Sequence, residues 1–323
     1  MVFYSYYIFA GSRTGVLRKI TFLVLVCALF VSCLTGKMRR ELAAEYFNLG
    51  NAFFELKNYD RAMALYQKAL SYSDSLPENN YNFARVHISQ ERYGEAIAIL
   101  EELLAGDPEN LILLQTLAYA QAKSGATDDA VLTYHRILSL SDGNVITLYN
   151  LSVLYEGEEK PEEAYRYLQT AYGIAPDDAG VLNRLGRLEA GYGSPETAIS
   201  YLQAYMEKKT DDAEAALFLS DLYKKQGLYA EALSLIETIL PRAAENPAIL
   251  FDEAFLLLTK AGERSKGLDS LTKALEAGFA DKDRAAQLLL EASPAVLKDV
   301  QSLLVAKGVL TAAEAEQILS LDA

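Results

Sequence analysis

The chain has 323 residues, of which 51% are hydrophobic, and it carries a formal net charge of −14. This apolar content is enough to build a core, so the composition excludes an intrinsically disordered protein over most of the length. The excess of acidic side chains repels phosphate backbones, so nucleic acid is excluded as a partner.

The first 33 residues have the composition of an export signal. Arg13, Arg18 and Lys19 precede an uncharged, mostly apolar run over residues 20–32. A positive segment followed by a short apolar run is typical of a secretory signal peptide. A membrane-spanning helix needs about 20 apolar residues, more than this run provides. We therefore expect an exported protein, with an uncleaved amino-terminal membrane anchor as the alternative.

Cysteine usage favours a lipid anchor. Cys27 and Cys33 both lie in this leader, so no disulfide or metal-thiolate site is expected in the rest of the chain. Residues 29–33 resemble the processing site of bacterial lipoproteins, although Phe30 stands where a leucine is usual. The resemblance implies acyl chains on Cys33, which would hold the protein on a membrane in the periplasm or at the outer membrane.

Two expectations concern the ends of this leader. The apolar residues 2–10 stand ahead of the positive segment, an unusual order for a signal peptide, so we expect translation to begin at Val16. Residues 34–42 are expected to form a tether after the leader, which ends at residue 33. The basic side chains of this tether either contact anionic lipid head groups or belong to the solvated start of the first helix.

A period of 34 residues dominates the rest of the chain. Alanine recurs with this spacing at six positions: Ala62, Ala96, Ala130, Ala164, Ala198 and Ala232. A column of large apolar residues stands thirteen positions upstream: Leu49, Phe83, Leu117, Leu151, Leu185 and Leu219. Self-similarity at a fixed spacing of this size indicates a helical repeat array.

Small side chains at one point of each repeat indicate two closely packed antiparallel helices. Helix axes approach to about 8–10 Å, depending on the side chains at the crossing. A second small column is expected to face the alanines: Gly50, Ala84, Ala118, Ser152, Gly186 and Ser220. Core residues are expected to fill the remaining space: Tyr66, Leu100, Tyr134, Leu168, Leu202 and Ile236, with Tyr59, Tyr93 and Tyr229 just before the second helices.

With Leu49, Gly50, Tyr59, Ala62 and Tyr66 in this arrangement, the chain resembles the tetratricopeptide-repeat family. The resemblance implies an all-α, right-handed α-solenoid of about seven helix-turn-helix units over residues 43–281. Six repeats over residues 43–246 are clear, and the seventh is atypical.

The seventh repeat and the carboxyl-terminal segment carry their own expectations. Gly267 takes the place of the alanine one residue late, so the turn over residues 261–264 is expected to be longer. Residues 282–323 are expected to form helices that cap the last apolar face of the array. Their expected positions are about 281–291, a helix begun by Ser293 and Pro294, and one capped by Thr311 with Glu314.

No pattern typical of a catalytic centre stands in this sequence. His87 and His135 are the only histidines, and they lie in different repeats. No serine, cysteine or carboxylate stands at motif spacing from either of them. His87 is expected to pack in the core and His135 to lie on the surface. We therefore expect no enzyme activity, no cofactor and no metal site.

In the tetratricopeptide-repeat family, the fifth and ninth positions of each first helix face a concave binding groove. Carried over by register, the resemblance implies these groove residues: Phe47, Asn51, Tyr81, Arg85, Gln115, Tyr119 and Tyr149. Aromatic rings beside amide and guanidinium donors suit an extended or helical peptide. The alternative is that the rings pack on neighbouring helices. Phe251, Phe255 and Leu258, at the far end, are expected to be buried under the terminal helices.

These patterns predict a non-catalytic scaffold of the bacterial cell envelope that binds an unidentified envelope protein. One alternative is a carrier of an apolar small molecule or lipid in the same groove, and another is an accessory subunit of an envelope enzyme. A cytosolic co-chaperone is not expected. Chaperone-tail-binding members of the family use cations where this chain has Phe47, Ile112 and Thr116.

Overall fold

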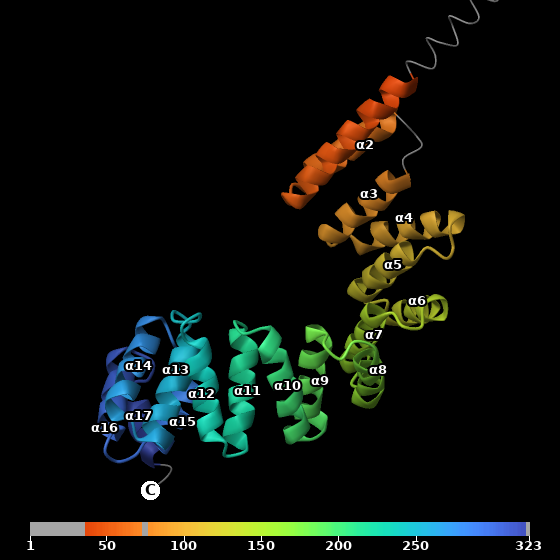
Figure 1. The fold of residues 1–323 in the computed structure, drawn as a ribbon. Coiled ribbons are helices and arrows are strands. Elements are labelled where there is room, and N and C mark those ends of the chain that lie inside the picture. The colour runs from red at the N-terminus through yellow and green to blue at the C-terminus, as the bar shows by residue number, and fades with distance from the viewer. Residues whose placement is uncertain (1–35, 73–76, 321–323) are drawn as a thin grey trace, which may run out of the picture. The chain divides into compact units, whose positions relative to one another are not determined.

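The computed structural model describes residues 36–72 and 77–320, which are helical apart from short connections (Figure 1). No strand occurs within these two ranges, so the all-α fold class is confirmed. The expected signal peptide and the lipidation site at Cys33 lie outside the described residues. The chain divides into two compact units, Met1–Asp142 and Gly143–Ala323.

The described part of the first unit consists of three helical hairpins. The first helix covers residues 36–55, so residues 36–42 of the expected tether are helical. The other helices are α2 (Tyr59–Tyr72), α3 (Pro77–Ser89), α4 (Tyr93–Gly106), α5 (Leu111–Ser124) and α6 (Thr127–Leu140).

The second unit consists of four hairpins and three terminal helices. The first three hairpins are α7 (Val145–Gly157) with α8 (Pro161–Ile174), α9 (Ala179–Tyr192) with α10 (Pro195–Lys208), and α11 (Ala213–Lys225) with α12 (Tyr229–Ile239). The fourth joins α13 (Pro247–Leu256) and η1 (Leu257–Ala261) to α14 (Arg264–Glu276). The terminal helices are α15 (Lys282–Glu291), α16 (Leu297–Ala306) and α17 (Ala312–Ser320).

A third set of residues with the 34-residue period lies at the start of the first helix in five successive repeats. An asparagine or aspartate in extended conformation stands before each helix, and its side chain accepts hydrogen bonds from amides of the first turn. These residues are Asn110, Asn144, Asp178, Asp212 and Asn246. Such caps satisfy backbone donors that have no partner inside the helix. The 34-residue period therefore fixes helix starts as well as helix packing.

The two small columns meet at the centre of the hairpins, as expected. All six alanines are fully buried. A Cβ added to Gly186 would lie 2.5 Å from Leu202 Cγ, and one added to Gly50 would lie 2.6 Å from the Tyr66 ring. Glycine is therefore required at these two crossings.

Two sets of residues are less buried than the rest of the packed hairpins: one member of the large apolar column and the tyrosines expected in the core. Leu49 is 47% exposed, because it lies in the first helix, which has no preceding hairpin within the described residues. Tyr59, Tyr93 and Tyr229 are half-buried. Each begins the second helix of its hairpin, at the edge of the packed interface, so its ring is covered in part.

The extra residue of the seventh repeat lies inside a helix. Residues Leu257–Ala261 form a π-helical turn that extends α13, and Gly262 then adopts a left-handed conformation with φ of 73°. The expectation of a longer turn is therefore wrong. A π turn takes up one more residue than an α turn. Gly267 packs against this segment, since a Cβ there would lie 2.6 Å from Leu258 Cγ.

The terminal helices follow the expected order with one correction. Asp281 caps α15, and Thr311 and Glu314 form a reciprocal cap at α17. The middle helix begins at Leu297 rather than at Ser293 and Pro294, because residues 294–296 form a turn. The expected burial of the far-end apolar residues is confirmed: Phe251, Phe255 and Leu258 are at most 5% exposed.

Candidate functional site

The predicted groove residues of the first unit are joined by a chain of hydrogen bonds between two repeats. Tyr66 Oη and Asn82 Nδ2 both donate to Asn51 Oδ1, at 2.8 Å and 3.1 Å. Arg85 Nη1 in turn donates to Asn82 Oδ1 at 3.1 Å. Asn51 is thus held by partners from two adjoining helices, and Arg85 is held by Asn82 on its own helix, α3. Asn82, which connects them, is 4% exposed.

The predicted aromatic residues of the first unit differ in how far neighbouring helices cover them. The Phe47 ring lies 5.8 Å from that of Tyr66, and Tyr81 Oη lies 3.2 Å from Thr116 Oγ1, so both contribute to packing between helices. Tyr119 is 43% exposed, with the ammonium group of Lys123 5.8 Å from its ring centroid. Tyr119 therefore presents the most open ring.

Two further predicted residues, Gln115 and Tyr149, are half-buried, and Arg85 has an additional contact. Gln115 is half-buried on α5. Tyr149 is half-buried on α7, which belongs to the second unit, and the guanidinium carbon of Arg184 lies 6.0 Å from its ring centroid. In the first unit, Arg85 lies 4.4 Å from the ring centroid of Phe54 and so covers one face of that ring.

The histidines lie much as expected. His87 is half-buried, and its Nδ1 atom is buried with no hydrogen-bond partner among the described residues. Burial and, after it, the nearby Arg92 lower its pKa, so the imidazole is neutral at pH 7. His135 is exposed.

Residues 36–72 and 77–320 contain neither a candidate metal site nor a candidate membrane span. No group of three or more histidine, cysteine, aspartate or glutamate side chains there could hold a metal ion. None of the helices in these ranges is long and apolar enough to cross a membrane.

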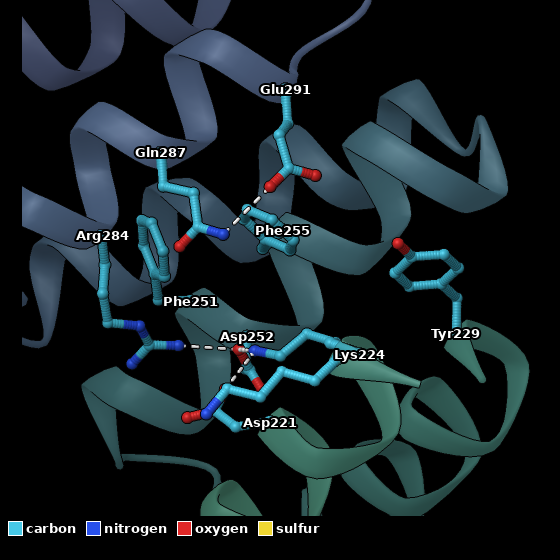
Figure 2. A pocket seen from close by; sticks show the side chains of 10 residues that line it. Asp221, Lys224, Tyr229, Phe251, Asp252, Phe255, Arg284, Gln287 and Glu291 are labelled. Atoms are coloured by element: carbon cyan, nitrogen blue, oxygen red, sulfur yellow. Dashed lines mark hydrogen bonds and ion pairs between the residues drawn. The ribbon is translucent and has the colours of Figure 1, made fainter. Parts of the chain in front are cut away.

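A more enclosed site lies in the second unit, between the last repeats and the terminal helix α15 (Figure 2). It is a cavity of about 330 Å³. Its lining residues are Asp221, Lys224, Lys225, Tyr229, Phe251, Asp252, Phe255, Arg284, Gln287 and Glu291. In Figure 2, side chains from α15 extend toward those of α11 and α13. The terminal helix therefore contributes polar groups as well as apolar cover.

A buried carboxylate is the centre of this site. Asp252 is fully buried and accepts three hydrogen bonds, from Ser220 Oγ, Lys224 Nζ and Arg284 Nη2, each at 2.7 Å. Both cations bond to the same carboxylate oxygen, Oδ1. Lys224 also reaches the exposed Asp221 at 2.6 Å. Burial of a carboxylate is costly unless it is paired and hydrogen-bonded, and Asp252 has partners of both kinds.

Aromatic rings hold the two cations in place. The guanidinium carbon of Arg284 lies 5.1 Å from the ring centroid of Phe251 and 5.7 Å from that of Phe279. These two rings stack on each other with centroids 3.9 Å apart. Lys224 Nζ lies 5.4 Å from the Phe255 centroid. Cation–π contacts of this kind fix the orientation of each charged head.

An acid, Glu291, lies at the other end of the α15 face that lines the cavity. Glu291 accepts a hydrogen bond from Gln287 at 2.9 Å and pairs with Lys260 at 2.8 Å. Burial raises the pKa of Glu291, but the bonds from Lys260 and Gln287 outweigh it, so the pKa lies below its ordinary value. Glu291 is therefore ionised at neutral pH. Charged pairs therefore lie at both ends of the cavity, Asp252 with Lys224 and Arg284 at one end and Glu291 with Lys260 at the other.

Reasoning from the repeat pattern missed this site. The resemblance placed Phe251 and Phe255 under the terminal helices, but it assigned nothing to Asp252 between them. One available signal was a charged residue in the apolar segment 247–258. Another was the spacing of Arg284, Gln287 and Glu291, which places all three on one face of α15.

Comparisons with known proteins agree with the repeat pattern. Two family models described as tetratricopeptide repeat match residues 87–145 and 189–250, and residues 146–178. A third model, described as anaphase-promoting complex, cyclosome, subunit 3, matches residues 27–103.

Two relatives match part of the chain. An uncharacterized lipoprotein of Treponema pallidum is 29% identical over 134 residues, which are 42% of this chain and 68% of the relative. The protein O-mannosyl-transferase Tmtc3 of Drosophila melanogaster is 27% identical over 134 residues. That match covers 41% of this chain but only 14% of the transferase.

Two solved structures share the fold. The C-terminal part of a TPR repeat-containing protein from Cytophaga hutchinsonii is 15% identical, with a TM-score of 0.58, and the match covers 74% of this chain and 99% of that one. A tetratricopeptide repeat protein from Parabacteroides merdae is 16% identical, with a TM-score of 0.51, and the match covers 81% and 98%. At these identities the likeness concerns the fold alone.

Proposed function

Because this chain belongs to the tetratricopeptide-repeat family, we propose that it is a non-catalytic scaffold that binds a segment of another protein on the first helices of its repeats. Stacked helical repeats create long surfaces suited to such binding. The proposed groove of the first unit consists of Phe47, Asn51, Tyr81, Arg85, Gln115 and Tyr119; Tyr149, on the second unit, is proposed as a further contact.

The observation that carries this proposal is the combination of a half-exposed ring with fixed polar groups. Tyr119 is 43% exposed, and aromatic rings of this kind serve as anchors in many interfaces. Arg85 is held by Asn82 and by Phe54, while a guanidinium group has five N–H donors in all. Donors held in place in this way suit the carbonyl groups of a bound peptide.

We further propose that the protein acts in the bacterial cell envelope, anchored through lipidated Cys33. The support is the positive segment and short apolar run before that cysteine, together with the similarity to a lipoprotein of Treponema pallidum. The partner is then an envelope protein. Carriage of an apolar molecule in the same groove is less well supported, because Arg85 covers a face of Phe54, one of the rings that would have to form an apolar wall.

A crosslinking pull-down from native envelopes tests the groove. Replacing Arg85 would also break its contact with Asn82, so we choose the double variant Tyr81→Phe with Tyr119→Ala. The first change removes one hydroxyl and the second removes an exposed ring, so helicity is expected to stay at the wild-type level. Leu132→Ala is the matched control, since Leu132 is 69% exposed on α6, a second helix of the same unit.

The expected result is a protein captured by the wild type and by the control but lost from the double variant. Circular dichroism of all three proteins checks that the folds are equal. If the double variant recovers the same proteins as the wild type, this groove is not the binding surface and the proposal is wrong.

A further inference from the structure

We propose that the cavity between α11, α13 and α15 is a second binding site, which takes a carboxylate group carried next to an apolar group. The carboxyl-terminal residue of a polypeptide has this chemistry, and so does a small aryl or alkyl carboxylic acid. The site lies wholly in the second unit, and the inference does not depend on the groove of the first unit.

Arg284 supplies the donors for such a ligand. Its guanidinium group has five N–H donors, and the bond to Asp252 uses one of them. Its side chain is 28% exposed and lines the cavity. A guanidinium fork binds carboxylates through two parallel hydrogen bonds, which are among the stronger bonds in proteins. Lys225, an exposed lining residue at the end of α11, adds a further positive charge.

The geometry of Arg284 is set before any ligand arrives. One edge of the guanidinium is tied to the buried Asp252, and its carbon lies near the stacked rings of Phe251 and Phe279. A side chain held in this way loses less rotamer entropy on binding than an unrestrained arginine. The site therefore has the preorganised cation that recognition of a carboxylate needs.

The rest of the cavity suits an apolar neighbour of that carboxylate. Phe255 and Tyr229 form part of the wall, on the side away from Arg284 (Figure 2). An ammonium group lies near each ring, Lys224 at 5.4 Å and Lys260 at 4.7 Å from the centroid, so the apolar part of a ligand meets the ring edges and the remaining faces. A volume of about 330 Å³ is at the small end of the range of ligand pockets, about 300–1,000 Å³. A single large residue or a compact acid fits a space of this size. Glu291 at the opposite end disfavours a ligand with two separated carboxylates.

A purely structural role for the network accounts for less of what is present. Glu156 and Arg184 form an ion pair between two inner repeats at 2.8 Å, with the same separation of 28 residues as Lys224 and Asp252. A single pair is therefore enough to join adjacent repeats. Arg284 is a second cation on the same carboxylate, contributed by the terminal helix. The test therefore asks whether Arg284 binds a ligand or only joins the terminal helix to the last repeats.

Isothermal titration of the full-length chain with three probes tests the inference. The probes are N-acetyl-Gly-Gly-Phe with a free carboxyl terminus, the same peptide as its carboxyl-terminal amide, and 3-phenylpropionate. The variant Arg284→Lys keeps a positive charge beside Asp252 but removes the guanidinium fork. Arg264→Lys is the matched control, because Arg264 lies on the exposed part of α14 and pairs with Asp299 away from the cavity.

We expect the peptide acid to bind the wild type about tenfold or more tightly than the amide, a factor that corresponds to about 1.4 kcal/mol. Arg284→Lys is expected to lose a similar factor with an unchanged melting curve, and Arg264→Lys to bind as the wild type does. Tight binding of 3-phenylpropionate would identify a small acid as a sufficient ligand. Much weaker binding of this probe would point to a polypeptide terminus.

Two results would overturn the inference. One is that the wild type shows no preference for the acid, either because the acid and the amide bind equally well or because no acid binds. The wild type alone gives this result. The other is that folded Arg284→Lys binds the acid as tightly as the wild type. The groove variant, Tyr81→Phe with Tyr119→Ala, is expected to bind the probes normally, so failure of one proposal leaves the other standing.

Discussion

The close approach of α9 and α10 gives a direct test of the packing described above. A Cβ added by Gly186→Ala would lie 2.5 Å from Leu202 Cγ, 3.0 Å from its Cδ2 and 3.3 Å from the carbonyl oxygen of Ala198. Leu202 is fully buried, so it has little room to move aside. One of the two helices must therefore shift, or Leu202 must leave its rotamer.

Two opposing terms set the magnitude. Alanine is favoured over glycine inside a helix by about 1 kcal/mol. Overpacking a tight core costs about 1–3 kcal/mol. We expect Gly186→Ala to lower the free energy of unfolding by about 1 kcal/mol. Gly173→Ala in α8 is the matched control, because a Cβ there meets no atom within 4 Å. That change is expected to raise stability by up to about 1 kcal/mol.

Urea denaturation followed by circular dichroism measures both variants against the wild type. The two substitutions are chemically identical and both lie in helices of the second unit, so propensity favours alanine at both, less strongly at Gly173, which is the penultimate residue of α8. The sign of the difference therefore isolates the contact with Leu202. Equal stabilisation by both variants would refute the argument, since it would show that the crossing has space for a methyl group.

Two further predictions concern helix ends. Asp212→Ala is expected to cost about 2 kcal/mol of unfolding free energy in urea titrations, because α11 loses its cap and Tyr205 loses its acceptor, while Asp212→Asn costs less. Bonds from Lys282 and Thr311 lower the pKa of Glu314 to about 2 from 4.5. Its contribution is complete above pH 4.5 and is lost toward pH 2. The protection factors of the α17 amides against hydrogen exchange should therefore fall toward pH 2, and Glu314→Gln should remove that pH dependence.

Most of the fold follows from the sequence because one packing constraint is repeated at every hairpin. Ala62 and its five counterparts are all buried, so the period of 34 locates each helix crossing. Burial follows the repeat period less closely where a residue lacks a neighbouring hairpin. Leu49 has the residue type of its column but no preceding hairpin within the described residues to cover it.

The groove of the first unit and the cavity around Asp252 are harder to predict from the sequence. The position of a residue in its repeat indicates where its side chain lies but not which groups it contacts. Position alone could not show that Arg85 bonds to Asn82 and lies over Phe54. The cavity around Asp252 depends on α15, which lies outside the period, so no column predicts that Arg284 reaches it. The seventh repeat could not be placed correctly either, since its extra residue is taken up by a π turn.

The buried carboxylate at the end of the array limits how the number of repeats can change during evolution. Inner repeats meet through similar alanine and leucine columns, so a duplicated inner repeat finds a neighbour of matching shape. Asp252 instead needs Lys224 from the repeat before it and Arg284 from the helix after it. A repeat inserted at either junction would separate a buried charge from one of its cations, at a cost of several kcal/mol. We therefore expect repeats to be gained or lost upstream of Lys224, with the last repeats kept together with their terminal helices.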